Sequence, residues 1–130
     1  MRQLPLLRFG AAVTVFPVAL LASPFDGVYR QSANAECALV GVDGGSIKIE
    51  NEIFYGVEVE CRMINPVEIE GMNAVLYDMA CIGEGSAWEE RAIMMEDAQT
   101  SGILMIWDGY AFRYARCNDP AAAATEAAAE

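Results

Sequence analysis

The sequence contains no histidine, and this absence excludes several classes of site. Without histidine there is no Ser-His-Asp or Cys-His catalysis in its usual form and no histidine-ligated metal. The four cysteines include no CxxC pair, so a zinc site is not expected either. The chain also lacks a P-loop and the glycine motif of dinucleotide-binding folds. We therefore expect a protein that is not an enzyme and that holds no cofactor and no metal.

Basic residues are scarce, with eight Lys and Arg against 19 Asp and Glu and a net charge of −11. Two of the eight, Arg2 and Arg8, precede an apolar run from Phe9 to Leu21, and the small residues Ala22 and Ser23 follow it. This order is typical of a secretory signal peptide, and it predicts that residues 1–22 are removed by cleavage after Ala22. The run is too short for a comfortable membrane span of about 20 residues, although an uncleaved anchor is the alternative.

Removal of residues 1–22 would leave all 19 acids against six bases, a net charge of −13. A surface of this sign repels phosphate backbones and anionic lipid, so we expect no nucleic-acid partner and no stable membrane insertion once the signal is removed. It would attract a basic protein or a divalent cation. Solubility alone is the simpler interpretation of the charge.

An even number of cysteines in a short exported chain predicts disulfides. We expect two bridges and no free thiol among Cys37, Cys61, Cys81 and Cys117. Nearness in sequence favours Cys37–Cys61 with Cys81–Cys117, whereas the strand directions of a strict meander favour Cys61–Cys117 with Cys37–Cys81. Both pairings stay open, with a slight preference for the first. The bridges predict a periplasmic or secreted protein.

Residues 23–118 read as one β-domain of short strands separated by turns. In the clearest case Val57, Val59, Cys61 and Met63 alternate with charged residues, which is the period of a half-buried strand. The expected strands cover residues 27–30, 46–50, 57–63, 67–70, 74–81, 87–96, 103–107 and 110–116. Residues 31–45 are expected to be irregular, with room for a helical turn within 31–40, and Asn65-Pro66 to break a strand. The predicted fold class is all-β: a small antiparallel meander of about seven to eight strands with two disulfides, forming a closed barrel or a sandwich.

The strongest hairpin signal is Asp108-Gly109, which favours a type I′ turn between residues 103–107 and 110–116. Pairing across this turn sets Trp107 opposite Tyr110, Met105 opposite Phe112 and Ile103 opposite Tyr114, all on one face. We interpret this face mainly as core. The alternative is a ligand face inside a barrel, lined by Trp107, Tyr110, Phe112 and Tyr114.

Three further features have simpler structural interpretations. The carboxylates Glu84, Glu89 and Glu90 surround Trp88, but acids are so frequent that this proximity is weak support for a glycosidase. Asp43 or Asp97 offers oxygen ligands for calcium without the spacing of an EF-hand. The scattered methionines indicate core filling rather than a Cu(I) site: Met63, Met72, Met79, Met94, Met95 and Met105. Residues 119–130 form an alanine-rich tail, expected to be disordered and outside the fold.

The order of several short segments resembles a group of small exported four-cysteine proteins of alphaproteobacteria that have no assigned activity. The segments are Gly27-Val28-Tyr29, Cys37, Val57-Glu58-Val59-Glu60-Cys61, Cys81-Ile82-Gly83-Glu84-Gly85 and Tyr114-Ala115-Arg116-Cys117. This resemblance implies a periplasmic address. In architecture alone, the chain is similar to the small periplasmic β-barrel inhibitors of C-type lysozyme, which also carry a signal peptide and disulfides.

Together these features predict a protein that binds rather than catalyses. The leading hypothesis is a periplasmic binding or inhibitor-like module that uses its acidic surface against a basic protein. The alternative is a structural or accessory domain of an envelope assembly, attached through a strand edge or the alanine-rich tail. The sequence gives no prediction of oligomeric state.

Overall fold

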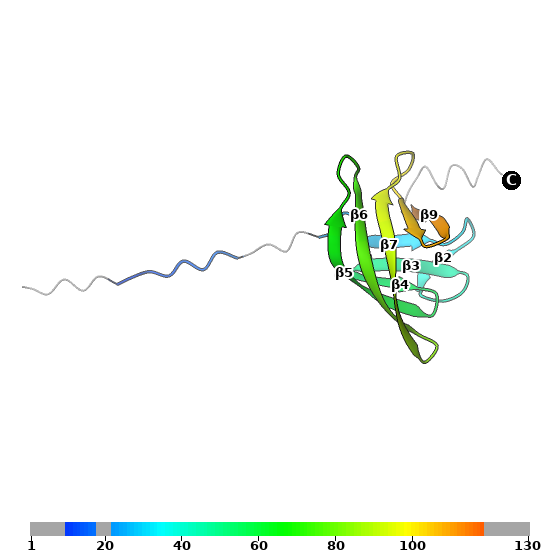
Figure 1. Cartoon of the computed structure of the whole chain (residues 1–130), viewed down its shortest axis with the longest axis horizontal. Coiled ribbons are helices and arrows are strands. Elements are labelled where there is room, and N and C mark those ends of the chain that lie inside the picture. Colours follow the sequence, from blue (N-terminus) through cyan, green and yellow to red (C-terminus); the bar gives the residue numbers. More distant parts are fainter. Residues whose placement is uncertain (1–9, 18–21, 119–130) are drawn as a thin grey trace, which may run out of the picture.

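The computed structural model describes residues 10–17 and 22–118, and the latter range contains nine β-strands and no helix (Figure 1). The strands are β1 (Gly27–Arg30), β2 (Glu36–Val40), β3 (Gly45–Glu50), β4 (Ile53–Gly56), β5 (Val59–Glu68), β6 (Ala74–Gly83), β7 (Ser86–Glu96), β8 (Ile103–Trp107) and β9 (Tyr110–Arg116). The predicted all-β fold is confirmed.

Eight of the strands form a closed antiparallel barrel. Consecutive strands from β3 to β9 pair with one another, and β1 pairs with both β9 and β3 to complete the circle. The contact between β1 and β3 covers four residue pairs, whereas that between β1 and β9 covers only Tyr29 with Arg116 and Arg30 with Ala115. The structure therefore selects the barrel over the sandwich, and its seam between β1 and β9 is short.

The extra strand is β2, which pairs with β3 in parallel (Figure 1). Residues 31–45 were expected to be irregular with a helical turn, and that expectation is wrong for Glu36–Val40. The strand was missed because four of its five residues are exposed and show no alternation. Gly45 allows its approach: a Cβ at this position would collide with the carbonyl oxygen of Leu39. β2 is thus held by backbone contact and by a disulfide rather than by a buried face.

Tight turns set the register of the long hairpins. Asn51 and Glu52 both have positive φ, as do Glu84 and Gly85, which is the backbone of a type I′ turn. At Asp108-Gly109 only Gly109 has positive φ, 92°, so the turn has the predicted two-residue length but is not type I′. Pairing across it is as predicted, from Trp107 opposite Tyr110 to Ile103 opposite Tyr114.

β5 is one strand rather than the two that the sequence predicted. Asn65-Pro66 does not break it; instead the register against β6 shifts between Ile64 and Val67, and Asn65 takes a φ of 51°. A bulge of this kind absorbs a proline because the extra residue is unpaired. The β4 strand (Ile53–Gly56), which had no assigned element in the sequence prediction, connects this strand to β3.

The barrel interior is filled by side chains that alternate along the strands. The largest fully buried ones, each less than 2% exposed, include Tyr29, Ile47, Ile49, Met79, Met94, Ile103 and Met105. Phe54 meets Trp107 edge-on, with ring centroids 6.0 Å apart. These side chains fill the centre of the barrel.

Arg116 strengthens the short seam between β1 and β9. Its guanidinium donates hydrogen bonds to the carbonyl oxygens of Asp26 (2.9 Å), Pro24 (3.1 Å) and Ser101 (2.7 Å). It also lies over the ring of Tyr29, 4.9 Å from the centroid. One side chain therefore joins the N-terminal segment, β1, β9 and the loop before β8.

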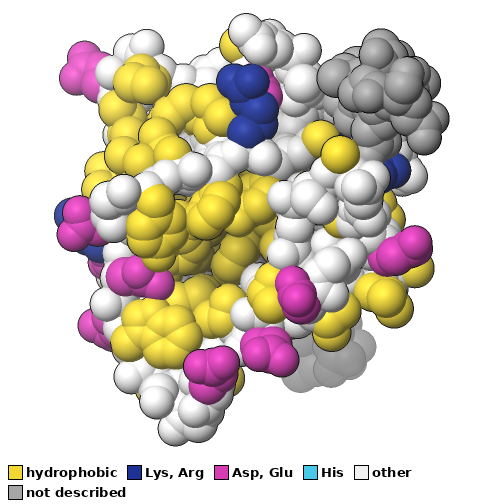
Figure 2. Space-filling model, turned by 90° about the vertical axis from the view of Figure 1, so that its right-hand side faces the viewer, with side chains coloured by type: hydrophobic (Ala, Val, Ile, Leu, Met, Phe, Trp, Pro, Cys, Tyr) yellow, Lys and Arg dark blue, Asp and Glu magenta, His cyan; other side chains and the backbone are white. Residues whose placement is uncertain are grey.

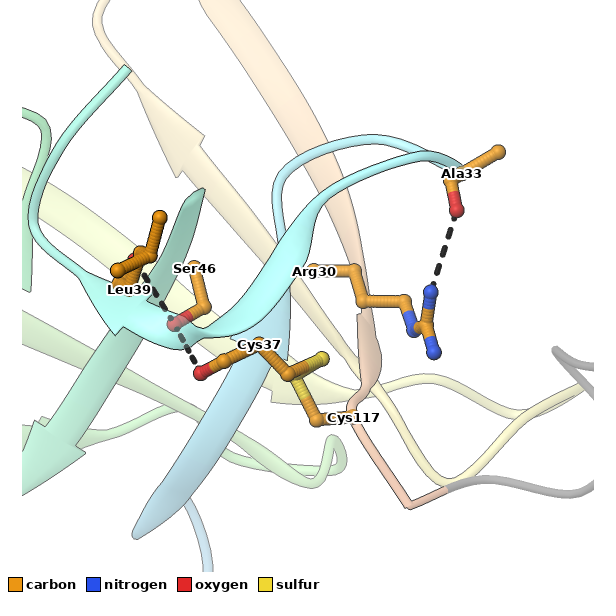
Figure 3. Close-up of a disulfide and its surroundings, with 6 residues drawn as sticks. All are labelled: Arg30, Ala33, Cys37, Leu39, Ser46 and Cys117. Atoms are coloured by element: carbon orange, nitrogen blue, oxygen red, sulfur yellow. Dashed lines mark hydrogen bonds between the residues drawn. A yellow bond between two sulfur atoms is a disulfide. The ribbon is translucent and has the colours of Figure 1, made fainter. Parts of the chain in front are cut away.

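Both disulfides form, but in neither of the pairings considered from sequence. Cys61 pairs with Cys81, its direct neighbour across β5 and β6, with Cα atoms 4.0 Å apart. Cys37 pairs with Cys117 and joins β2 to the end of β9 (Figure 3). The sequence argument failed because it weighed nearness in sequence and strand direction without the register that sets Cys61 opposite Cys81. Beside the second bridge, the buried Ser46 hydroxyl donates to the carbonyl oxygen of Cys37 at 2.9 Å (Figure 3).

The structure describes the two ends of the chain only in part. Residues 10–17 form no helix or strand and are exposed, whereas the rest of the predicted signal peptide up to residue 21 and the alanine-rich tail (119–130) lie outside the described residues. Within the described part of the chain, no helix has the length and apolar character needed to cross a membrane. The two disulfides fit an oxidising compartment outside the cytoplasm.

Candidate binding surface

The hairpin of β8 and β9 carries the row of aromatic residues that the sequence singled out. Trp107 and Tyr114 are 9% and 8% exposed and belong to the core. Tyr110 and Phe112 point to the same face but are 52% and 43% exposed, so the interpretation of these two as core is wrong. They miss the core because β1 pairs with β9 only at Ala115 and Arg116, which leaves the barrel wall open beside the rest of the strand.

The exposed rings are held against buried ones. Phe112 stacks on Tyr114 with centroids 5.5 Å apart and planes 17° from parallel. Tyr110 meets Phe112 edge-on, also at 5.5 Å. Burial raises the pKa of the Tyr114 hydroxyl to about 12, and the neighbouring Tyr110 adds to the rise. The row therefore runs from a neutral, fixed tyrosine in the core to two aromatic rings open to solvent.

Trp88 is a third exposed aromatic residue on the same face. It lies opposite Cys81 and in phase with Ala92 along β7, and both of those are buried. Trp88 itself is 39% exposed because β8 ends at Trp107 and does not cover this part of β7. Together we call Trp88, Tyr110 and Phe112 the aromatic face. The sequence placed Trp88 only among carboxylates, although its phase with Ala92 and Met94 is a signal that it points inward.

Acidic side chains lie beside this face. The indole Nε1 of Trp88 donates to Glu90 Oε1 at 2.9 Å, and Trp88 shares a surface groove with Glu58 and Glu84. Asp108 is exposed in the turn that precedes Tyr110. Figure 2 views the side on which β9 and β2 lie in Figure 1, and it shows hydrophobic side chains in a hollow with Asp and Glu along its lower rim.

The carboxylates considered for catalysis do not converge. Glu89 and Glu90 are consecutive on β7 and so point to opposite faces, and Glu84 lies in the turn between β6 and β7. Glu90 is hydrogen-bonded to Trp88. In the part of the chain that the structure describes, no three His, Cys, Asp or Glu side chains are grouped to hold a metal ion.

Asp97, a candidate calcium ligand, is occupied by protein contacts. Its side chain accepts hydrogen bonds from the backbone N–H of Gln99 (2.9 Å) and the hydroxyl of Thr100 (3.1 Å). Arg113 Nε lies 3.0 Å from Asp97 Oδ2, and the Asp97 side chain is only 1% exposed. Asp97 thus organises the loop before β8, and Asp43, the other candidate, is an exposed loop residue.

The methionines are mostly interior, as a core-filling role requires. Met63, Met79, Met94 and Met105 are at most 3% exposed, whereas Met72 is 54% exposed in the turn between β5 and β6. They lie on four different strands and form no exposed thioether cluster among the described residues.

The surface also holds larger grooves. One, of about 680 Å³, lies where the end of β2 meets the outer faces of β4, β5 and β6, and it adjoins the Trp88 groove, with which it shares Glu58 and Gly83. Another, of about 640 Å³, contains Phe25, Glu68 and Glu70. Neither groove brings together described side chains that would form a catalytic or metal-binding group.

No protein-family model, no curated protein and no solved structure matches this chain. The two resemblances drawn from the sequence therefore remain predictions.

Proposed function

We propose that this protein is a periplasmic binding or inhibitor-like module that captures a basic protein and performs no catalysis. The observation that supports this proposal is the aromatic face, whose rings lie in phase with core residues and yet are open to solvent. Exposed aromatic residues are enriched at protein interfaces because they bury a large area with little loss of conformational freedom.

The charge of the chain supports a basic partner. All but three of the 19 acids lie in residues 22–118, together with six of the eight bases, and Glu58, Glu84, Glu90 and Asp108 lie beside the aromatic face or its hairpin turn. Such a surface accelerates association with a cationic protein and disfavours nucleic acid. Aromatic rings can also accept Lys or Arg heads by cation–π contact.

Capture from an extract at two salt concentrations tests this function. The protein, purified after expression of the full chain, is immobilised and exposed to periplasmic extract at low and at high salt. We expect basic proteins to be retained at low salt and largely lost at high salt, because exposed charges are screened over about 8 Å at physiological ionic strength. Retention that does not change with salt would contradict the electrostatic proposal.

A matched pair of variants locates the contact. Changing Glu58 and Glu84 to Gln removes two charges beside Trp88, and changing Glu68 and Glu70 to Gln removes two from a groove elsewhere on β5 and the loop that follows it. We expect the first pair to weaken capture clearly more than the second. Equal effects would mean that only net charge matters and would contradict a role for the aromatic face.

The second candidate function is an accessory domain of an envelope assembly. The observation that favours it is that β9 has β8 on one side but, for most of its length, no described strand on the other. A permanent assembly contact made through this strand would resist salt, so the same capture experiment separates the two functions.

A further inference from the structure

The free side of β9 is a ready pairing edge. β9 has seven residues, and β1 pairs only with Ala115 and Arg116 at its end. Along Tyr110–Tyr114 the described residues offer no strand on the side away from β8. Residues 110–113 are also exposed in succession.

The strand pairing shows which backbone groups are available. Trp107 and Tyr110 flank a two-residue turn, which makes them a hydrogen-bonded pair, and such pairs then alternate along the hairpin. The N–H and C=O groups of Ala111 and Arg113 therefore point away from β8. The bond from Cys117 N–H to the Val28 carbonyl, 3.0 Å, follows the same alternation where β1 is present.

Other free edges of the barrel are protected, and this one is not. The uncovered part of β5 contains a bulge, Asn65 with positive φ and Pro66. The uncovered part of β7 carries three consecutive charges, Glu89 to Arg91. These are the devices that prevent unwanted strand pairing.

β9 has neither a proline nor a bulge between Tyr110 and Tyr114. Its single charge in this stretch is Arg113, and that side chain is held by Asp97 from the loop before β8. The free edge is thus unbroken by a bulge or proline, aromatic on one face and open.

We propose that this edge binds an extended, basic segment of the partner protein by strand addition, antiparallel or parallel to β9. The inference rests on the proposed function and specifies how capture occurs. Backbone groups of the segment pair with those of Ala111 and Arg113, and alternate side chains of the segment cover Tyr110 and Phe112. Its Lys and Arg residues meet the acidic surface beside the aromatic face.

Charge complementarity favours this occupant over two others. A second copy of the chain would bring together two acidic proteins, each with a net charge of −11. The chain's own tail, residues 119–130, contains three acids and no base. A basic segment from another protein is attracted by the acidic surface, whereas a second copy and the tail are both repelled by it.

A short capped peptide of alternating lysine and valine tests the inference. About seven residues suffice to cover the free stretch, given a rise of about 3.4 Å per residue. We expect binding by calorimetry or fluorescence anisotropy at low salt. The same peptide with N-methyl groups at alternate backbone positions keeps every charge and side chain but loses half of its donors, so its affinity should fall by roughly tenfold or more.

Two proline variants form the matched control on the protein. Ala111→Pro removes an N–H that points to the free edge of β9. Ala87→Pro removes the equivalent N–H on β7, which is also exposed and uncovered by β8. Ala111→Pro should weaken peptide binding by roughly tenfold, and Ala87→Pro should leave it unchanged.

Several outcomes would overturn strand addition at β9: no peptide binding to the wild-type protein, equal binding of the N-methylated peptide, or equal loss in the two variants. A wild-type dimer that Ala111→Pro dissociates, without peptide binding, would assign the edge to a second copy instead. Tighter binding on deletion of residues 119–130 would show that the tail competes for the edge. Basic proteins retained in extract by both wild type and Ala111→Pro would support the proposed function while contradicting this mode of capture.

Discussion

Cys37 and Cys117 are 80 residues apart in sequence, and their bridge joins β2 to the residue that follows β9. Next to this bridge, β9 has only two residue pairs with β1. The bridge thus spans the place where the barrel closes. It also ties down β2, which has only a short parallel contact with β3.

Removing the Cys37–Cys117 bridge should lower the free energy of unfolding more than removing the Cys61–Cys81 bridge. In the chain-entropy description, a loop closed by residues 80 apart is worth about 4.5 kcal/mol and one closed by residues 20 apart about 3.3 kcal/mol. We expect the Cys37→Ser, Cys117→Ser double variant to lose about 4 kcal/mol in urea unfolding. Its β2 amides should also exchange with solvent faster. Unchanged exchange in Glu36–Val40 would show that β3 alone holds the strand.

Arg116 should be the most important surface arginine for stability. Its three hydrogen bonds end on the main-chain carbonyl oxygens of Pro24, Asp26 and Ser101, so they join the segment before β1 to the loop before β8. We expect Arg116→Ala to lower the free energy of unfolding by about 2–3 kcal/mol. Arg91→Ala is the control, since its ion pair with Asp78 is exposed and should be worth less than about 1 kcal/mol. Equal losses would contradict the role of Arg116 in the seam.

Alkaline pH should destabilise the barrel through its buried tyrosines. Burial raises the pKa of Tyr29 and of Tyr114 from 10.0 to about 12. Between pH 10 and 12 the tyrosines lose their protons more readily in the unfolded chain than in the folded one. Their contribution to the free energy of unfolding is therefore fully present below pH 10 and is lost as the pH rises. Each tyrosine then accounts for about 1.4 kcal/mol of loss at pH 11.

Tyr114→Phe isolates one of these contributions. The fall in unfolding free energy between pH 8 and pH 11 should be smaller in the variant by about 1.4 kcal/mol. Urea unfolding at both pH values measures the difference. An identical fall in the two proteins would mean that the Tyr114 hydroxyl ionises as easily in the folded as in the unfolded state.

The sequence predicted the strands whose side chains alternate, because alternation reflects one buried face. The hairpin of β8 and β9 was predicted in full register for this reason. It missed β2, whose contacts are made by the backbone and by Cys37 rather than by a buried face. The disulfide pairing could not be predicted because it depends on the register of β5 against β6, which places Cys61 opposite Cys81.

The candidate surface was half predictable. Phase along the hairpin identified Tyr110 and Phe112 as members of one face with Trp107 and Tyr114. Phase does not tell whether a neighbouring strand covers that face. Here β1 is four residues long and β9 seven, and this difference in length exposes the two rings. The acidic charge of the chain, in contrast, follows directly from its composition.

Truncation of the aromatic row should separate the exposed rings from the core. Tyr110→Ala and Phe112→Ala remove side chains that are 52% and 43% exposed, so each should cost no more than about 1 kcal/mol in urea unfolding. Tyr114→Ala removes a ring that is 8% exposed and should cost about 3–5 kcal/mol. If Phe112→Ala costs as much as Tyr114→Ala, the ring is part of the core in solution and is not available to a partner. If it costs little and also weakens capture of basic proteins, its burial occurs on binding rather than on folding.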